Sequence, residues 1–203
     1  MSDPAISRVS YDEYLRLQGE TDARLEYVDG TVRPLPDWIP DALGMAGGTP
    51  EHSQLATAFA TLVRQALGTR PCVVYGSDLR LRLESARRTT YADVAVVCGS
   101  REVSREDRNA LVNPTVLVEV LSESSERYDR GEKWRLYRQC LESLREYVLV
   151  SQREPLVEVF RRDESGGWSF REHGPGGRVV LASIGVEIDV DELFRDPLAA
   201  QKP

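Results

Sequence analysis

The pattern of apolar and polar positions predicts a buried strand at residues 114–122, near the middle of the chain. Positions 116–121 are apolar and largely β-branched except for Glu119, and such a run is typical of a strand covered on both faces of a sheet. A buried carboxylate without a partner would cost several kcal/mol. Glu119 is therefore expected to be neutral, ion-paired or bound to a metal.

Helical spacing follows this strand directly, at residues 125–142. Asp129, Lys133 and Tyr137 recur every four residues, which puts all three on one face of a helix. A buried acid followed by a helix that presents an acid, a lysine and a tyrosine on one side indicates a metal-dependent active site. The competing interpretation is an Asp129–Lys133 pair on a solvated face, worth ~0.3–0.5 kcal/mol, with Tyr137 as a packing residue whose hydroxyl is hydrogen-bonded.

Two other segments have helical signatures. Residues 10–18 begin with a capping box made by Ser10 and Glu13. Residues 50–68 carry an apolar stripe at helical spacing and end at Gly68, a typical C-cap. We therefore expect helices on both sides of the long segment 34–50, which is rich in proline and glycine and is predicted to be an irregular loop.

The N-terminal strands are predicted to form a β-hairpin at residues 24–33, because Asp29 and Gly30 make a favoured two-residue turn. Glu26 lies in the first strand of this hairpin. The alternation at 78–84 predicts a strand with one wet face, and the polar segment 99–113 predicts a surface connection. Further strands are expected at 72–75, 91–98, 146–151 and 156–161, before a β-rich C-terminal part that extends to residue 194.

These elements predict an α/β fold with a central mixed β-sheet flanked by helices. The strands near 91–97 and 115–121 are expected to be central neighbours, covered by the helices near 52–67 and 125–142. A length of 203 residues suits one domain, so we expect residues 1–203 to form a single domain with its core at about 10–195.

Composition narrows the class of protein. Apolar residues make up 41% and charged residues 29% of the chain, without an apolar run long enough to span a bilayer or a visible secretory signal. The three cysteines are far apart in the sequence, which favours reduced core thiols in a cytoplasmic protein. The net charge of −7 argues against a large non-specific surface for nucleic acid but does not exclude a nuclease, since a carboxylate metal site is itself negative.

A second acid gives the chemistry its form. Asp93 lies near the start of the predicted strand at 91–98, and two carboxylates on adjacent central strands repel each other unless a cation lies between them. Mg²⁺, or Mn²⁺ in its place, suits such a site because it takes one or two carboxylates, keeps several waters and meets substrate phosphate. Lys133 would then stabilise developing charge or orient the attacking water. Without a metal, both carboxylates are expected to have raised pKa values.

Several segments together resemble the Uma family, described as "putative restriction endonucleases", a branch of the PD-(D/E)XK nuclease-like superfamily. The similar segments cover most of the chain, from about residue 10 to 195, and they are His52 at the start of a helix together with residues 24–30, 91–93, 118–122, 129–137 and 182–194. The resemblance implies a restriction-endonuclease-like fold with an N-terminal β-hairpin. It also implies DNA as the substrate and a divalent metal ion as the cofactor.

The resemblance also implies roles for individual residues. Asp93 matches the acid of the "PD" element and Glu119 that of the "(D/E)XK" element, with the main-chain carbonyl of Val120 as a further metal ligand. Glu26 matches an acid of the family's hairpin, as an additional ligand or a water-orienting group, while His52, Asp129 and Tyr137 are accessory candidates. Ala92 replaces the usual proline, and Leu121 occupies the lysine position, so Lys133 would supply the positive charge from the helix.

Three functions of different classes stay open at this point. The first is a Mg²⁺-dependent endonuclease that acts on DNA. The second is a nuclease-fold protein that binds nucleic acid or a partner without cutting it. The third is a structural or interaction module, for example a homodimer, in which the acids are hydrogen-bonded core groups and His52 a helix-terminal residue. A zinc hydrolase is disfavoured because the chain has only two histidines, His52 and His173.

Overall fold

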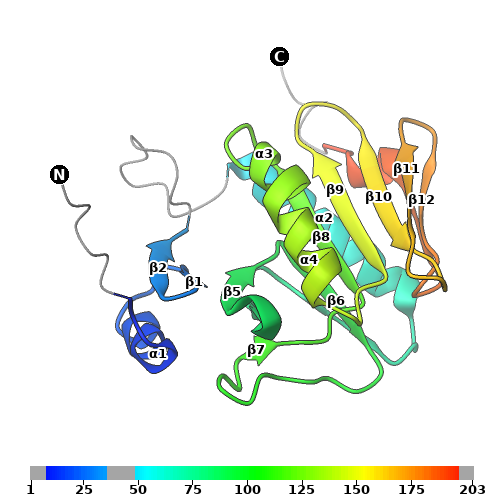
Figure 1. Cartoon of the computed structure of the whole chain (residues 1–203). Helices are drawn as coiled ribbons and strands as arrows, with labels where there is room; N and C mark the ends of the chain where they lie inside the picture. The colour runs from blue at the N-terminus through cyan, green and yellow to red at the C-terminus, as the bar shows by residue number, and fades with distance from the viewer. Residues whose placement is uncertain (1–7, 36–48, 197–203) are drawn as a thin grey trace.

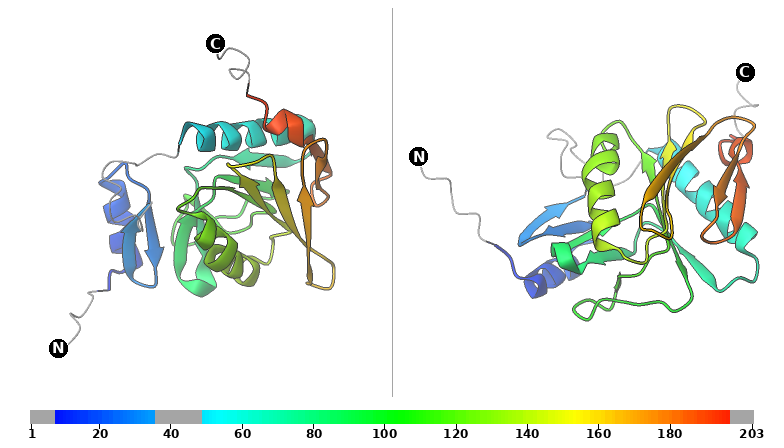
Figure 2. Two further views of the ribbon diagram at one scale, coloured as in Figure 1. Left: turned by 90° about the horizontal axis from the view of Figure 1, so that it is seen from above. Right: turned by 45° about the vertical axis from the view of Figure 1, so that its right-hand side comes forward.

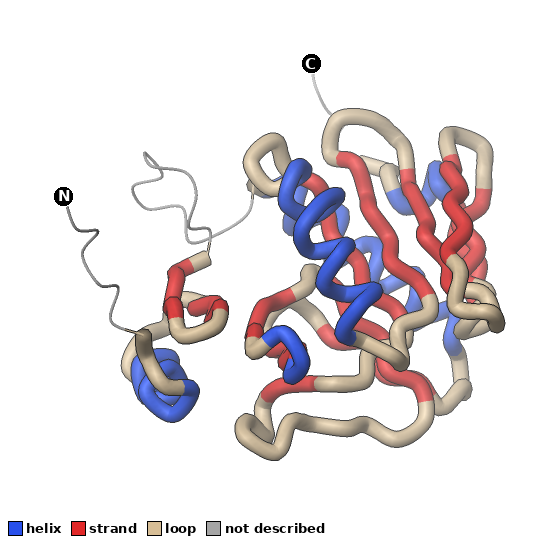
Figure 3. The backbone as a smooth tube through the Cα atoms, viewed as in Figure 1, coloured by secondary structure: helices blue, strands red, loops and turns tan. Residues whose placement is uncertain are grey.

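The structure is a computed structural model that describes residues 8–35 and 49–196 of the chain, and Figure 1 shows it as a mixed α/β arrangement. The tube view in Figure 3 separates the helices from the strands that they cover. The helices are α1 (Tyr11–Gly19), α2 (Pro50–Leu67), α3 (Glu126–Tyr128), the π-helix η2 (Asp129–Lys133), α4 (Trp134–Cys140) and α5 (Val190–Leu193), with a 3₁₀ turn η1 (Glu84–Ala86). Within the two described ranges, we find no helix with the length and apolar character of a membrane span.

A six-stranded mixed sheet lies at the centre, in the order β11-β10-β9-β8-β6-β3. Its middle strand β8 pairs antiparallel with β6, Val94 opposite Val118, and parallel with β9 on the other side. The predicted central neighbours are therefore confirmed. The strands of this sheet are β3 (Cys72–Tyr75), β6 (Val94–Cys98), β8 (Val116–Leu121), β9 (Glu146–Ser151), β10 (Val157–Arg162) and β11 (Trp168–His173).

The alternation of side chains along β8 divides the core between two faces of this sheet. Val118 and Val120 pack with Phe59 of α2 on one face, together with the hairpin of β12 (Arg178–Leu181) and β13 (Val186–Asp189). Leu117 and Leu121 pack with residues of α4 on the other face. The left view in Figure 2 shows α2 and α4 on opposite sides of the strands, so both predicted flanking helices are in place.

A second, five-stranded sheet has the order β2-β1-β5-β4-β7. The predicted hairpin is present, and Asp29 and Gly30 both have positive φ, 43° and 91°, as a tight two-residue turn requires. The strands of this sheet are β1 (Leu25–Val28), β2 (Thr31–Pro34), β4 (Arg80–Leu83), β5 (Arg88–Tyr91) and β7 (Ala110–Leu111).

Both predicted helix starts are capped by side chains. Ser10 accepts a hydrogen bond from the amide of Glu13 at the start of α1, and Thr49 accepts one from the amide of His52 at the start of α2. Gly68 ends α2 with φ at 56°, as expected for a C-cap glycine. Of the loop predicted at 34–50, residues 36–48 lie outside the described residues.

The segment 125–142 is not the single α-helix that the spacing predicts. Between α3 and α4 the chain widens into η2, where the amide of Trp134 donates to the carbonyl of Asp129, five residues back. That carbonyl also accepts a 3.0 Å hydrogen bond from the hydroxyl of Tyr147, and Gly131 has a low helix propensity. Short π-helical segments recur at functional sites.

Tertiary packing covers parts of two segments that the sequence predicts to be exposed. The strand at 78–84 has no wet face at Arg82, a residue that is 4% exposed and whose guanidinium lies 3.9 Å from the ring centre of Tyr11 while pairing with Glu106. Most of the connection at 99–113 is exposed, as predicted, but it contains the buried strand β7, which pairs with β4. Polarity alone could not reveal these contacts between distant segments.

The prediction of reduced thiols is also wrong for two of the cysteines. Cys72 and Cys98 form a disulfide, while Cys140 is free. The two half-cystines lie directly opposite each other on the antiparallel strands β3 and β6, with their Cα atoms 4.0 Å apart. Their 26-residue separation in the sequence conceals this pairing, because only the strand register brings them together. The single domain and the cytoplasmic location stay predictions.

Candidate active site

Asp93 is fixed to the backbone of β8 at two points. Its amide donates a 3.1 Å hydrogen bond to the carbonyl of Val118, and its Oδ2 accepts a 2.8 Å hydrogen bond from the amide of Val120. Asp93 directly precedes β6, so its position follows from the register of β6 against β8. The acid is therefore held rigidly beside Glu119.

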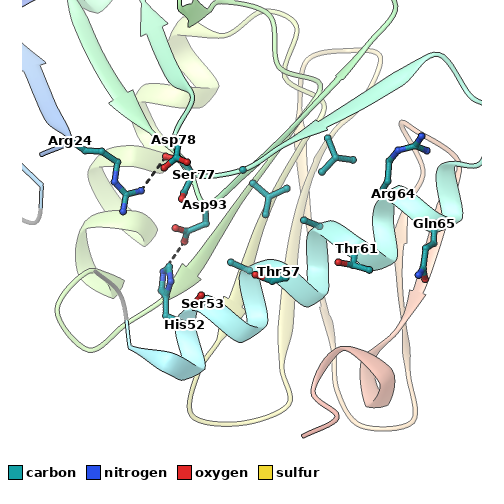
Figure 4. Close-up of a pocket in the computed structure, with 15 residues that line it drawn as sticks. Arg24, His52, Ser53, Thr57, Thr61, Arg64, Gln65, Ser77, Asp78 and Asp93 are labelled. Carbon is teal, nitrogen blue, oxygen red and sulfur yellow. Dashed lines mark hydrogen bonds and ion pairs between the residues drawn. The ribbon is translucent and has the colours of Figure 1, made fainter. Parts of the chain in front are cut away.

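His52 approaches the same carboxylate from the first turn of α2. Its Nε2 lies 3.1 Å from Oδ2 of Asp93, an interaction that Figure 4 marks with a dashed line. The hydrogen bond to Asp93 raises the pKa of His52, burial lowers it, and the charges of Asp93 and Asp129 raise it again, so the net shift is upward. The cap at Thr49 fixes the backbone of this turn and with it the position of the imidazole.

The pKa of Asp93 differs from the prediction. Burial raises the pKa of Asp93, but the hydrogen bond and the charge of His52, followed by the charge of Lys133, outweigh it, so the pKa lies below the ordinary value. The predicted upward shift from mutual repulsion of the two acids does not hold for Asp93, because the fold brings cationic partners to its carboxylate.

Along β8, Glu119 alternates with Val118 and Val120 and so lies on the face of the sheet that α4 covers, the same face as Leu117 and Leu121. It is 2% exposed. Its Oε2 lies 2.9 Å from Nζ of Lys133, and its Oε1 accepts a 3.1 Å hydrogen bond from the hydroxyl of Tyr137. Burial raises the pKa of Glu119 well above its ordinary value, and the charge of Lys133 opposes this shift. The charges of Asp129 and Asp93 add to the upward shift, so the carboxyl responds to both acids.

Lys133 lies between two buried acids. Besides Glu119, its Nζ is 3.2 Å from Oδ1 of Asp129, one turn earlier in η2. Burial lowers the pKa of Lys133, but the charges of Glu119 and Asp129 outweigh this effect, so the pKa of Lys133 lies well above the ordinary value. Oδ1 of Asp129 is buried and is held by this ion pair with Lys133.

Glu26 is buried on β1. Its carboxylate accepts a short hydrogen bond from Thr90 and lies 3.5 Å from the hydroxyl of Tyr128 and 3.7 Å from a guanidinium nitrogen of Arg88. The ring centre of Tyr128 is 5.7 Å from Nζ of Lys133. Tyr128 thus joins Glu26 to the cluster of Lys133.

The structure gathers the predicted residues in two groups, Asp93 with His52, and Glu119 with Lys133, Asp129 and Tyr137. The charges of the two groups influence each other. Val120 contributes its amide to Asp93, while its side chain packs against α2 in the core. Leu121 packs on the face of α4, and Lys133 reaches Glu119 from η2 in the place of a strand lysine.

Sequence reasoning missed Arg88, Tyr128 and Tyr147, which hold the surroundings of this cluster. Arg88 pairs with Glu132 and Tyr128, and Tyr147 donates to the carbonyl of Asp129. The β-branched pair before Tyr91 could have indicated the strand β5 that carries Arg88. The contacts themselves had no signal in the sequence.

The residues present fit a hard divalent cation. Among the described residues, no three His, Cys, Asp or Glu side chains surround one point as a complete metal site. Mg²⁺ does not require such a cage, since it binds one or two carboxylates and completes its shell with waters and substrate oxygens. The carboxylates of Asp93 and Glu119, from adjacent strands, and that of Asp129 are oxygen donors of this kind.

Comparisons with known proteins find a family model and relatives that match most of the chain. The family model described as "Uma2: Putative restriction endonuclease" matches residues 11–191. The "Uncharacterized protein slr1290" of Synechocystis sp. is 31% identical over 188 residues, covering 93% of this chain and 92% of that protein. The "Uncharacterized protein sll1609" of the same organism is 26% identical over 160 residues, covering 79% and 84%.

The fold also has a counterpart among solved structures. The crystal structure of a "putative nuclease belonging to DUF820" from Anabaena variabilis superposes with a TM-score of 0.69, covering 92% of this chain and 97% of that chain at 18% identity. At this identity the likeness establishes the fold, and the predicted restriction-endonuclease-like architecture is confirmed.

Proposed function

Since the chain belongs to the Uma2 family, described as "putative restriction endonucleases", we propose that it is a Mg²⁺-dependent endonuclease that hydrolyses phosphodiester bonds of DNA. The observation that carries the proposal is the buried ion pair of Glu119 and Lys133, next to the clamped carboxylate of Asp93. Buried acids with perturbed pKa values cluster at functional sites. A core that needed only stability would be served as well by apolar residues.

Asp93 and Glu119 would hold the Mg²⁺ or Mn²⁺ ion, together with the main-chain carbonyl of Val120. When bound, the ion lowers the pKa of a water ligand and polarises the phosphate of the substrate. His52 keeps the carboxylate of Asp93 in one orientation through its 3.1 Å contact, and Tyr137 does the same for Glu119 through its 3.1 Å hydrogen bond. Orientation of ligating carboxylates by such neighbours tunes metal affinity.

Lys133 stabilises negative charge on the phosphate as the bond to the attacking water forms. Its raised pKa keeps it protonated at neutral pH. Asp129 also holds its Nζ, at 3.2 Å. Glu26, linked to Lys133 through Tyr128, serves as a further acid that orients water at the edge of the site.

A second candidate is a nuclease-fold protein that binds nucleic acid or a partner without cutting. The contact between Lys133 and Glu119 favours it, because a lysine already neutralises the acid that the metal requires. The net charge of −7 favours it as well. A homodimer and a cytoplasmic location remain predictions from the sequence.

A plasmid-nicking assay with Mg²⁺ or Mn²⁺ separates the two candidates. The wild-type protein is expected to convert supercoiled plasmid to the nicked or linear form, and Glu119→Gln to leave it intact. Glu158→Gln is the matched control, since Glu158 on β10 is also buried but pairs with Arg130 of η2. Wild-type protein that binds Mn²⁺ yet leaves single- and double-stranded DNA intact would favour the non-cutting candidate.

A further inference from the structure

A groove of about 730 Å³ runs along α2 and starts at the candidate active site. Asp93 and His52 line one end, and Arg64 and Gln65 line the other. Figure 4 shows the helix as one wall of this groove, with the turn at Ser77 and Asp78 across from its first residues. The roles proposed above use only Asp93 and His52 of this surface.

The wall formed by α2 carries a hydroxyl on every turn. Ser53, Thr57 and Thr61 are four residues apart, so they form a row on one face of the helix, and all three are exposed. The small residues Ala56 and Ala60 line the same groove and leave space above the helix. This face therefore offers hydrogen-bond donors in sequence instead of an apolar surface.

Arginines lie at both ends of the row of hydroxyls. Arg24 is fixed near Asp93 by a 3.1 Å hydrogen bond from its guanidinium to the carbonyl of Ser77. Arg64 is exposed and donates to the carbonyl of Gly68 at 3.2 Å. The two acids of the groove, Asp78 and Asp93, are both at the end of the active site, so the far end is cationic.

We infer that this groove binds the sugar–phosphate backbone of one DNA strand as it leaves the candidate active site. The inference rests on the proposed function and adds the path of the substrate. Hydroxyl, amide and guanidinium donors are the usual partners of phosphate oxygens. No Phe, Tyr or Trp is among the described residues that line the groove, so the backbone is recognised here and stacked bases are not.

The length of the row fits several nucleotides. From His52 to Arg64 the helix rises roughly 18 Å, which corresponds to about five nucleotides of one strand in B-form DNA. Arg64 is then a phosphate contact remote from the bond that is cut. Arg64 therefore contributes to the affinity for DNA. This contribution decreases as the salt concentration rises and does not depend on the DNA sequence.

The test is DNA binding by fluorescence anisotropy in EDTA, with single-stranded and duplex forms of one labelled oligonucleotide over a range of salt concentrations. Arg64→Gln is expected to weaken binding several-fold and to reduce the slope of log K against log salt by about 0.7 for single strands or about 0.9 for duplex. Whether the single-stranded or the duplex oligonucleotide loses affinity in Arg64→Gln shows which kind of DNA the groove binds. Thr61→Val, which removes a hydroxyl at nearly constant shape, is expected to weaken binding by a smaller factor.

Arg138→Gln is the matched control, because Arg138 is exposed on α4, on the face of the central sheet opposite to α2. Equal affinities and salt slopes for Arg64→Gln and Arg138→Gln would overturn the inference, as would the absence of DNA binding by the wild-type protein. Because no metal is present, the result does not depend on cleavage. A groove that binds DNA in a protein that never cuts it would sustain the inference and contradict the proposed nuclease.

Discussion

Glu119 and Glu146 are buried acids on the neighbouring strands β8 and β9, yet their surroundings differ in kind. Both are almost fully buried, 2% and 0% exposed. In the parallel register, Glu146 lies opposite Val116 at the start of the strands, while Glu119 lies near their carboxyl ends. Ligands of open α/β sheets bind beyond those carboxyl ends.

The partners of Glu146 are mostly fixed donors. Its carboxylate accepts hydrogen bonds from Nε of Arg161 at 2.7 Å, from the amides of Ala182 and Ser183 at 3.0 and 3.3 Å, and from the hydroxyl of Ser183. Two of these donors belong to the backbone and an arginine does not deprotonate at ordinary pH. Glu146 therefore joins β9 and β10 to the hairpin of β12 and β13.

The partners of Glu119 are an ammonium and a phenol, both on side chains of the segment η2–α4. Among the described residues, no main-chain amide donates a hydrogen bond to the carboxylate of Glu119, whereas the carboxylate of Asp93 accepts one from Val120. An acid held by side chains can exchange its partner for a metal ion or a substrate. Glu146 is therefore bound to the fold in part by main-chain donors, whereas Glu119 is held by side chains alone among the described residues.

The largest expected effect on stability comes from Glu146→Ala. It leaves Arg161 and the donors at Ala182 and Ser183 without their acceptor, which should lower the free energy of unfolding by about 3–5 kcal/mol. Urea denaturation measures this change. Glu187→Ala is the control, since Glu187 is exposed on β13 and its pair with Arg178 is expected to contribute less than about 1 kcal/mol. The cleavage rate per folded molecule of Glu146→Ala should equal that of the wild type. A lower rate would contradict a purely structural role of Glu146.

The largest effect on turnover is expected from Lys133→Met. Removal of one charge-stabilising group should reduce turnover by roughly 10²–10³-fold while Mn²⁺ binding persists. Arg130→Met is the matched control, because Arg130 also belongs to η2 but pairs with Glu126 and Glu158. A Lys133→Met protein that cuts at the wild-type rate would return this lysine to a purely structural role.

Loss of the Cys72–Cys98 disulfide should affect stability and spare the chemistry. For a link across 26 positions of sequence, replacing both cysteines by serine is expected to lower the free energy of unfolding by roughly 3 kcal/mol. Thermal denaturation of this double variant beside Cys140→Ser, which changes the free thiol, measures the difference. Equal stability of the two variants would show that β3 and β6 do not need the link.

The smallest effect concerns pH and the region of Glu146. Burial lowers the pKa of His173, and the charges of Arg161 and Arg171 lower it further. Because the unfolded chain then binds a proton more readily, the free energy of unfolding should decrease as pH falls below about 6.5. The free energy of unfolding, measured at several values between about pH 5 and 7, where histidine titrates, should decrease with falling pH in the wild type. The decrease should be smaller in His173→Gln. An equal decrease in the variant would remove His173 as its source.

Local patterns predicted the elements that depend on few neighbours. The apolar run around Glu119, the capping residue Ser10 and the turn at Asp29 each carry their own physical signal, and the structure confirms these elements. A buried acid can also be recognised in the sequence as a carboxylate within an apolar run, since its burial costs free energy unless it has a partner. The same pattern did not single out Glu146, at the edge of its run.

What the sequence could not provide depends on tertiary contacts. The π-helical turn at Asp129 places Lys133 between two acids, and the cationic partners of Asp93 lower its pKa instead of raising it. Strand register alone makes Cys72 meet Cys98. Each outcome joins segments that are distant in the chain, so spacing and composition carried no information about it.

Calorimetric titration of Mn²⁺ into the wild type, Glu119→Gln and Glu146→Gln tests most directly whether Glu119 is the acid available for chemistry. The wild type and Glu146→Gln are expected to bind one ion with similar affinity, and Glu119→Gln to lose binding, since a neutral amide is a far weaker ligand than a carboxylate. Unchanged binding by Glu119→Gln, or no binding by the wild type, would contradict this assignment.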